Sequence, residues 1–177
     1  MTQPMTCHTY SAPAPWGELR FWCDGTHLYA LALSGQRGYV APRPSDVSLT
    51  LGEATALPIE QAVHLWLDTY FGGEIPASLP PIRLVGSPFQ LEVWSQLLDL
   101  PYGTVTTYGC IAEDIARKRG IPRMAAQAIG GAIRRNPVSI ILPCHRVIGR
   151  NGDMIGYTGG LHFKTALLEL ERSVSSD

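Results

Sequence analysis

The sequence is short of three features: long apolar runs, paired cysteines and charge. No stretch reaches the ~20 consecutive apolar residues that a membrane-spanning helix needs. Residues 1–16, MTQPMTCHTYSAPAPW, lack the basic start and apolar core of a signal peptide, so we expect a cytoplasmic protein. The four cysteines, at positions 7, 23, 110 and 144, form no CxxC pair, and their spacing suggests no disulfide framework. In a reducing compartment they would be free thiols.

Charged residues make up 16% of the chain, and the net charge of −1 argues against nucleic-acid binding. Their distribution argues otherwise. Residues 1–85 carry 4 Lys/Arg and 7 Asp/Glu, whereas residues 86–177 carry 10 and 8. Between positions 115 and 152 there are eight basic residues and no acidic one. This excess indicates either a phosphate-facing surface or a solvated basic face balanced by acids folded against it.

The first half of the chain has an α/β pattern. Alternating apolar residues in 17–33, interrupted by Asp24-Gly25, predict a β-hairpin, and another strand is expected near 47–51. Residues 59–71 carry an apolar stripe at helical spacing, and Gly72-Gly73 ends it. Residues 74–81, EIPASLPP, suggest an interdomain connection, and a short strand follows. We therefore predict an α/β domain over 1–85.

The second half, 86–177, is predicted to be a mostly α domain. Ser87 and Gln90 have the spacing of a capping box, with Pro88 at the first position of a helix running to about 98. A second helix is expected from about Thr107 to Gly120, and a third from Pro122 to about Arg135. Two helices joined by a short Gly-containing turn with basic residues around it have the outline of a helix-turn-helix.

The third predicted helix is unusually rich in Ala and Gly: MAAQAIGGAIRR. Two mid-helix glycines cost about 1 kcal/mol each relative to Ala. One reading is close packing against another helix. The other is a thin helix that enters a narrow groove, since the minor groove of DNA is only about 6 Å wide. Gln127 is the longer side chain on that small surface.

Residues 138–150, VSIILPCHRVIGR, place a thiol, an imidazole and a guanidinium directly after an apolar run that reads as a buried strand. A lone cysteine is more often an inert core residue. A neighbouring imidazole, however, is the kind of group that activates a thiol nucleophile. Cys144 and His145 are therefore the candidate reactive pair.

Five segments in order resemble the O6-alkylguanine-DNA alkyltransferases: PYGTVTTY at 101–108, AAQAIGGA at 125–132, RRNP at 134–137, PCHRV at 143–147 and GYTGGLHFK at 156–164. The resemblance covers residues 87–171 closely. Residues 1–85 resemble the ribonuclease-H-like domain of that family only in pattern, and the second domain would contain a winged helix-turn-helix.

The resemblance implies a DNA repair protein, a methylated-DNA–protein-cysteine S-methyltransferase. Such proteins move the alkyl group of O6-alkylguanine irreversibly onto one cysteine, once per molecule, without a cofactor. The partner implied is double-stranded DNA carrying O6-alkylguanine, bound through its minor groove by a monomer, with the damaged nucleotide flipped into a pocket. No membrane partner is implied.

The resemblance also assigns the catalytic group. Cys144 is the nucleophile, and His145 is the base, acting through a water molecule. Glu171 orients the imidazole, and Glu169 would face elsewhere on the helix. Tyr108 donates to the guanine ring, although a lone tyrosine on a helix face is more often core. Asn136 holds the turn before the active-site strand.

The substrate and DNA sites follow in the same way. Tyr157, Thr158 and Gly159 would line the base pocket, and the Val147 carbonyl would accept from the exocyclic amine. The DNA-binding residues implied are Arg123, Ala126, Gln127, Arg134 and Arg135. One departure stands out: the family usually has arginine, which fills the gap left by the flipped base, where this chain has Gln127. Glutamine is shorter and uncharged, but it still offers a donor and an acceptor.

Two questions stay open in the sequence. Some relatives bind zinc in the first domain, and Cys7, Cys23 and His27 offer three ligands, but the spacing is irregular and we predict no metal site. Cys23 is expected in the sheet core instead. The rival function is a non-catalytic damage sensor or winged-helix regulator, and retention of Cys144, His145 and Glu171 favours the transferase.

Overall fold

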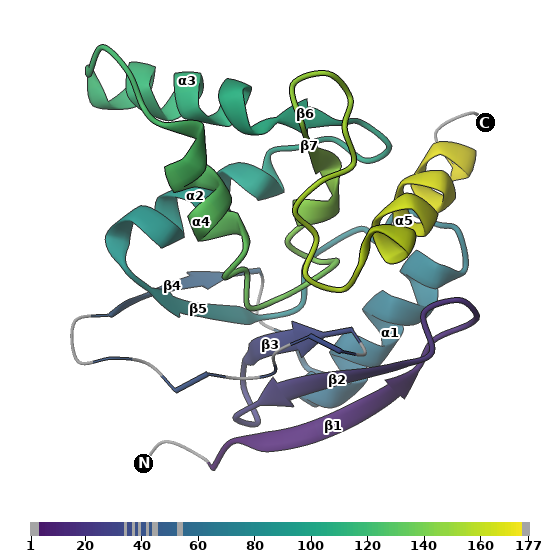
Figure 1. The fold of residues 1–177 in the computed structure, drawn as a ribbon. Coiled ribbons are helices and arrows are strands. Elements are labelled where there is room, and N and C mark those ends of the chain that lie inside the picture. The colour runs from purple at the N-terminus through teal and green to yellow at the C-terminus, as the bar shows by residue number, and fades with distance from the viewer. Residues whose placement is uncertain are drawn as a thin grey trace.

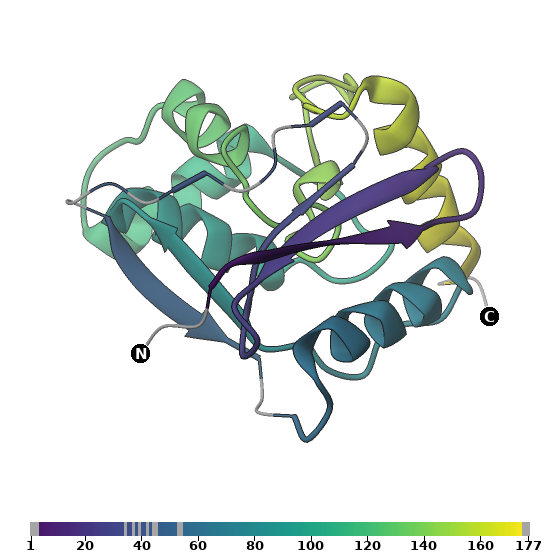
Figure 2. The ribbon, with the colours of Figure 1, turned by 90° about the horizontal axis from the view of Figure 1, so that it is seen from below.

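The computed structural model describes residues 4–33, 35, 36, 38, 40, 41, 43, 46–52 and 55–174. A five-stranded sheet holds the first half, in the order β1-β2-β3-β5-β4. Its strands are β1 (Thr6–Ser11), β2 (Glu18–Cys23), β3 (Leu28–Ala32), β4 (Val47–Leu51) and β5 (Ile82–Gly86). β3 and β5 run parallel, and the other neighbours are antiparallel. Helix α1 (Ile59–Phe71) packs along the sheet, as Figures 1 and 2 show.

The hairpin predicted over 17–33 is confirmed as β2 and β3, with Leu19, Phe21 and Cys23 buried on one side. The strand predicted near 47–51 and the helix over 59–71 also form as expected. In α1 the stripe formed by Ile59, Val63, Trp66 and Tyr70 is buried. The period of the apolar residues was the deciding signal in each case.

The segment 74–81 is not an interdomain connection, contrary to the sequence prediction. It joins α1 to β5, and β5 pairs with both β3 and β4 inside the same sheet. The segment is an irregular loop that leads from the helix to the next strand without strand pairing of its own. Its prolines are compatible with such a loop. The chain leaves the sheet after Gly86.

Helices dominate the second half: α2 (Pro88–Leu98), α3 (Tyr108–Arg119), α4 (Ala126–Ile133) and α5 (Leu161–Val174). The predicted capping box of Ser87 and Gln90 is present at the start of α2. Thr107 caps the start of α3, and Gly120 ends it in a left-handed conformation with φ of 64°. Each of these signals is local, so the sequence alone located them.

The third predicted helix is shorter than expected. It begins at Ala126, not at Pro122, and ends at Ile133. The N–H groups of Gly120 and Ile121 donate to carbonyls in the last turn of α3. The chain changes direction over the residues that follow, so the next helix begins later than predicted. Close packing does not require glycine at position 130, because a Cβ there would lie 3.8 Å from the Tyr108 ring, an ordinary van der Waals distance.

The strand predicted at 138–142 is instead a buried turn. Val138 makes only an isolated bridge to Leu31, and Ile140 has a φ of 71°, which a β-branched residue rarely adopts. The Asn136 side chain spans the turn, because it donates to the Leu142 carbonyl at 2.8 Å and accepts from the Val138 N–H at 2.9 Å. An apolar run shows burial, but it does not distinguish a strand from a buried turn.

After Pro143 the chain makes one 3₁₀ turn, η1 (Cys144–Arg146), and then β7 (Val147–Ile148), which pairs in parallel with β6 (Thr106–Thr107). Helix α5 packs against η1 and lies beside α1 (Figure 1). One continuous apolar core runs from the sheet through α2, α3 and α4 to α5. Among the described residues, no helix has the length and apolarity needed to cross a bilayer.

Candidate active site

Cys144 lies at the start of the 3₁₀ turn with 6% of its surface exposed. Burial raises the pKa of its thiol, while a hydrogen bond from Asn136 and the nearby Lys164 charge oppose that rise. The turn at 137–142 and Pro143 precede Cys144 in the chain and so fix where it lies. Asn136 therefore both fixes the preceding turn and touches the thiol, which agrees with its predicted place between α4 and the cysteine.

Glu171 of α5 is fully buried and gathers several segments of the chain. Its Oε1 lies 2.6 Å from His145 Nε2 and accepts from Arg146 Nη2 at 2.9 Å. Its Oε2 accepts from Arg146 Nε at 2.8 Å and from the Gly103 N–H at 3.2 Å. Despite burial, the hydrogen bonds from His145 and Arg146 and the positive charge of Arg146 lower the pKa of Glu171 to about 2. The carboxylate is therefore ionised at neutral pH.

His145 is held in one tautomer by this carboxylate. Because ionised Glu171 can only accept, Nε2 must carry the proton that lies between them. Burial lowers the pKa of His145, so its ring is neutral at pH 7 and Nδ1 carries a bare lone pair. Nδ1 is buried and has no hydrogen-bond partner among the residues that the structure describes. The geometry leaves one nitrogen of His145 available as a proton acceptor.

Arg146 and Lys164 are the cations of the site. Arg146 donates to the Leu100 carbonyl at 2.6 Å and also holds Glu171 through two hydrogen bonds, a pairing that the sequence did not indicate. Lys164 received no role from the sequence, yet it is fully buried and donates to the Val147 and Ile155 carbonyls, each at 2.7 Å. Burial lowers the pKa of Lys164, and the charge of Cys144 opposes that change. A lysine inside the quoted GYTGGLHFK segment was the available signal.

The loop before α5 forms a pocket of about 380 Å³ beside this cluster. Its lining includes Tyr157 and Thr158 from the predicted base pocket, with Arg134, Met154, Ile155, Gly156 and Leu161. The Tyr157 hydroxyl is buried and has no partner within the described part of the chain. Gly159 is next to Tyr157, where a Cβ would approach the ring to 3.2 Å. Of the predicted substrate residues, Tyr157 and Thr158 thus line this pocket, whereas Gly159 and Val147 are not among its lining residues.

Tyr108, at the start of α3, reaches the same loop. Its hydroxyl donates to the Ile155 carbonyl at 3.3 Å, and a Cβ on Gly156 would sit 2.6 Å from that hydroxyl. Glycine at position 156 therefore allows the tyrosine to approach. The structure places Tyr108 against the loop that contains the pocket-lining Ile155 and Gly156, and its hydroxyl bonds to the backbone there.

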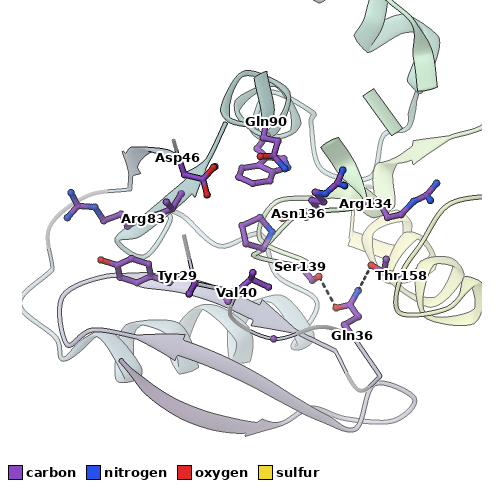
Figure 3. Close-up of a pocket in the computed structure, with 18 of the residues that line it drawn as sticks. Tyr29, Gln36, Val40, Asp46, Arg83, Gln90, Arg134, Asn136, Ser139 and Thr158 are labelled. Atoms are coloured by element: carbon purple, nitrogen blue, oxygen red, sulfur yellow. Dashed lines mark hydrogen bonds between the residues drawn. The ribbon is translucent and has the colours of Figure 1, made fainter. Parts of the chain in front are cut away.

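Gln36 follows β3 and was not singled out in the sequence. Its side chain accepts from Ser139 Oγ at 2.8 Å and donates to Thr158 Oγ1 at 3.2 Å, as the dashed lines of Figure 3 show. The residue lines a second cavity of about 580 Å³, together with Arg83 and Asn136. Loop 156–160 is thus tied to the first half of the chain by a contact that no local pattern reveals.

The predicted DNA-binding side chains lie apart from this buried cluster. Ala126, Gln127, Arg134 and Arg135 are exposed on or next to α4, and Arg123 is exposed on the connection before it. Arg117 and Arg119 of α3 differ, because they pair with Asp114 and Glu92. Some of the basic residues are therefore paired with acidic side chains, and others lie on open surface. The two alternatives that the sequence suggested each apply to part of the set. Arg134 also lines the 380 Å³ pocket and so joins the two regions.

Within the described ranges, no group of three His, Cys, Asp or Glu side chains is arranged to hold a metal ion. Cys23 is buried in the sheet, as expected, and Cys7 is exposed.

Comparison with known proteins identifies the family. The model of the 6-O-methylguanine DNA methyltransferase DNA-binding domain matches residues 88–173. A methylated-DNA–protein-cysteine methyltransferase of Haemophilus influenzae is 35% identical over 161 residues, which cover 90% of this chain and 83% of that protein. The chain belongs to this family.

Two further relatives locate the similarity. The Mycobacterium leprae methyltransferase is 51% identical over 106 residues, which make up 60% of this chain and 61% of that protein. The solved structure of Mycobacterium tuberculosis OGT in complex with DNA superposes with a TM-score of 0.74 at 36% identity. That match covers 95% of this chain and 93% of the other. Both halves of the family fold are therefore present: a mixed sheet with a helix, followed by a helical region.

Proposed function

We propose that this protein repairs DNA by transferring the methyl group of O6-methylguanine to its own Cys144, once per molecule. The observation that carries the proposal is the buried series Cys144, His145 and Glu171, in which the imidazole beside Cys144 in the chain bonds to Glu171 through one nitrogen and keeps the other without a partner among the described residues. The relatives named as methyltransferases support the reaction.

The chemistry is a displacement at carbon. The Cys144 thiol loses its proton, by way of water, to Nδ1 of His145, and Glu171 stabilises the imidazolium that forms. The thiolate sulfur then bonds to the methyl carbon as the carbon–O6 bond breaks. The electron pair stays on the guanine, which takes up a proton and remains in the DNA as the repaired base. The sulfur–carbon bond is a stable thioether, so the protein is consumed.

The base would occupy the 380 Å³ pocket. The Val147 carbonyl has a second lone pair beyond the one used by Lys164, so it can accept from the exocyclic amine. Thr158 and Gly159 present backbone N–H groups toward O6, and Tyr108 turns from the Ile155 carbonyl to the guanine ring. Lys164 places a positive charge near the thiolate that attacks. Tyr157 forms the wall of the pocket.

For DNA, we propose that α3 and α4 act as a helix-turn-helix of winged type, with α4 in the minor groove. Ala126 and its small neighbours allow close approach, Gln127 fills the gap left by the flipped nucleotide, and Arg123, Arg134 and Arg135 contact phosphate. The protein would bind as a monomer. We further propose the division into a ribonuclease-H-like domain, 1–85, and a DNA-binding and active-site domain, 86–177.

Intact mass measurement tests the proposal. The protein is incubated with a duplex that contains one O6-methylguanine, and with the same duplex without the lesion. One added methyl group per molecule, on the peptide that contains Cys144, is the expected result. Binding to the lesion with no gain in mass would instead support a damage sensor, the rival function.

A further inference from the structure

The active-site carboxylate has a partner outside the second half of the chain. Tyr70, in the last turn of α1, donates its hydroxyl to Glu171 Oε1 at 2.9 Å across 101 residues of sequence. Tyr70 has 1% of its surface exposed, and Glu171 has none. The contact is therefore fully shielded from water, where a hydrogen bond to a charged group is strongest.

Tyr70 and His145 share one oxygen. His145 Nε2 lies 2.6 Å from the same Oε1 that accepts from Tyr70. A donor on that oxygen draws off part of its negative charge, so it weakens the pull on the His145 proton. Burial and the negative Glu171 raise the pKa of Tyr70 well above its ordinary value, which keeps the phenol protonated and donating.

The other charged groups around this oxygen come from each neighbouring element. Arg146 of η1 holds both carboxylate oxygens, and Lys164 of α5 contributes positive charge toward His145. Tyr102, in the loop after α2, packs its ring against Tyr70 with centroids 5.8 Å apart, and the Arg146 guanidinium lies over it. Tyr70 is thus a donor from the first half of the chain to a cluster that also contains Gly103, His145 and Arg146 of the second half.

We propose that Tyr70 is a positioning residue of the relay: its hydroxyl holds Glu171 Oε1 and sets the strength of the Glu171–His145 hydrogen bond. Its consequence for alkyl transfer rests on the proposed function, but the hydrogen bond itself does not. The sheet-bearing half of the protein then takes part in tuning the active site, beyond serving as a support.

The test replaces Tyr70 by Phe, with Tyr10→Phe as the matched control. Tyr10 also donates from a buried ring to a carboxylate, Asp68 of the same helix, at 2.8 Å, but away from the site. Proton–nitrogen NMR of the histidine rings follows His145 Nε2–H, assigned by its loss in His145→Gln. We expect Tyr70→Phe to move this proton downfield, because the hydrogen bond to Glu171 strengthens, and Tyr10→Phe to leave it in place. An unmoved resonance in Tyr70→Phe overturns the proposal.

The transfer rate from a methylated duplex, measured against pH, gives the second readout. Without the Tyr70 hydroxyl, Glu171 Oε1 has one donor fewer and stabilises the His145 imidazolium more strongly. The acid limb of the profile should therefore move to higher pH by about half a unit in Tyr70→Phe. An acid limb that coincides with wild type, or that moves equally in Tyr10→Phe, overturns the role in the relay. Wild-type protein that transfers no methyl refutes the proposed function instead, and the NMR result still decides the hydrogen bond.

If Tyr70→Phe does not fold, 3-fluorotyrosine placed at position 70 replaces it. This residue keeps the ring and the hydroxyl but is the stronger donor, because fluorine makes the phenol more acidic. Both shifts should then reverse: the Nε2–H proton moves upfield and the acid limb moves to lower pH. Unchanged or unreversed values would refute the proposal in the same way.

Discussion

The buried cluster around Cys144 and the open surface of α4 are built on opposite physical principles. In the cluster, Glu171 and His145 are removed from water, and the pKa values of both are displaced from their ordinary values. On the surface, the side chains of Gln127 and Arg134 are exposed to solvent. The first region is organised without a ligand, whereas the second would gain its contacts from DNA in the proposed function. Chemistry and recognition are therefore separable by mutation.

The largest effect is expected from Cys144→Ser, which tests that separation directly. The hydroxyl is similar in size but far less acidic than the thiol, so methyl transfer should fall below detection in intact mass measurements. Affinity for the methylated duplex, measured by fluorescence anisotropy, should stay within about twofold, because the residue is buried away from phosphate. A serine variant that still gains a methyl group would mean that another residue is the acceptor.

Glu171→Gln should slow transfer by about tenfold or more, since the variant no longer stabilises an imidazolium at His145. The matched control is Glu169→Gln, an exposed glutamate on the same helix. Single-turnover rates and duplex affinity of both variants make the comparison. Equal rates for the two variants would show that the relay does not run through Glu171.

The same pair of variants has a signature in stability. The pKa of Glu171 is about 2 in the folded protein against an ordinary 4.5, so its stabilising contribution is complete above pH 4.5 and is lost as the pH falls toward 2. That interval corresponds to about 3 kcal/mol. Urea unfolding between pH 5 and pH 2 should show this loss in wild type and in Glu169→Gln, but a shallower pH dependence in Glu171→Gln.

On the surface, Arg134→Ala with Arg135→Ala should weaken binding to damaged and undamaged duplex alike, by about tenfold at low salt. The salt dependence should become shallower by up to two phosphate contacts, because each contact releases counterions. Arg117→Ala with Arg119→Ala is the control that removes equal charge. These two arginines are already paired with Asp114 and Glu92, so a smaller loss is expected. Equal losses in the two double variants would place the DNA face across both helices.

The smallest effects concern Gln127. Filling the gap left by a flipped base recovers part of the few kcal/mol that flipping costs. Gln127→Ala should therefore slow transfer from duplex by a few-fold and barely change reaction with free O6-benzylguanine, which needs no flipping. Gln127→Arg should raise the duplex rate, because arginine adds a planar, cationic stacking surface. If alanine slows both substrates equally, the residue supports the fold or the pocket instead.

The sequence predicted what depends on local order and missed what depends on distant contacts. Capping at Ser87, Thr107 and Gly120 and the pairing of β2 with β3 are encoded within a few residues. The turn at 137–142 looked like a strand, because its hydrophobicity shows burial and its shape depends on the Asn136 side chain. The start of α4 was misplaced for a related reason, since the end of α3 determines how the chain continues.

The candidate site divides in the same way. Cys144 and His145 are adjacent in sequence, and resemblance to a family pointed to Glu171. Tyr70 and Gln36 reach the site from 101 and 122 residues away. Tyr70 stands in the apolar stripe of α1, which predicts burial but not a contact with Glu171, and Gln36 stands in no recognisable pattern. Lys164 was inside a quoted segment, but its burial is visible only in three dimensions. Roles of the predicted residues in catalysis stay predictions until the variants above are measured.

The position of Glu171 on the last described helix has a consequence for biosynthesis. A ribosome makes Tyr70 first, then Cys144 and His145, and Glu171 only later, so the nucleophile leaves the ribosome before its relay is complete. Closing contacts of such long sequence separation is also slow relative to forming the helices. In the proposed mechanism, the thiol of the nascent chain therefore becomes reactive only when α5 docks against α1 and η1.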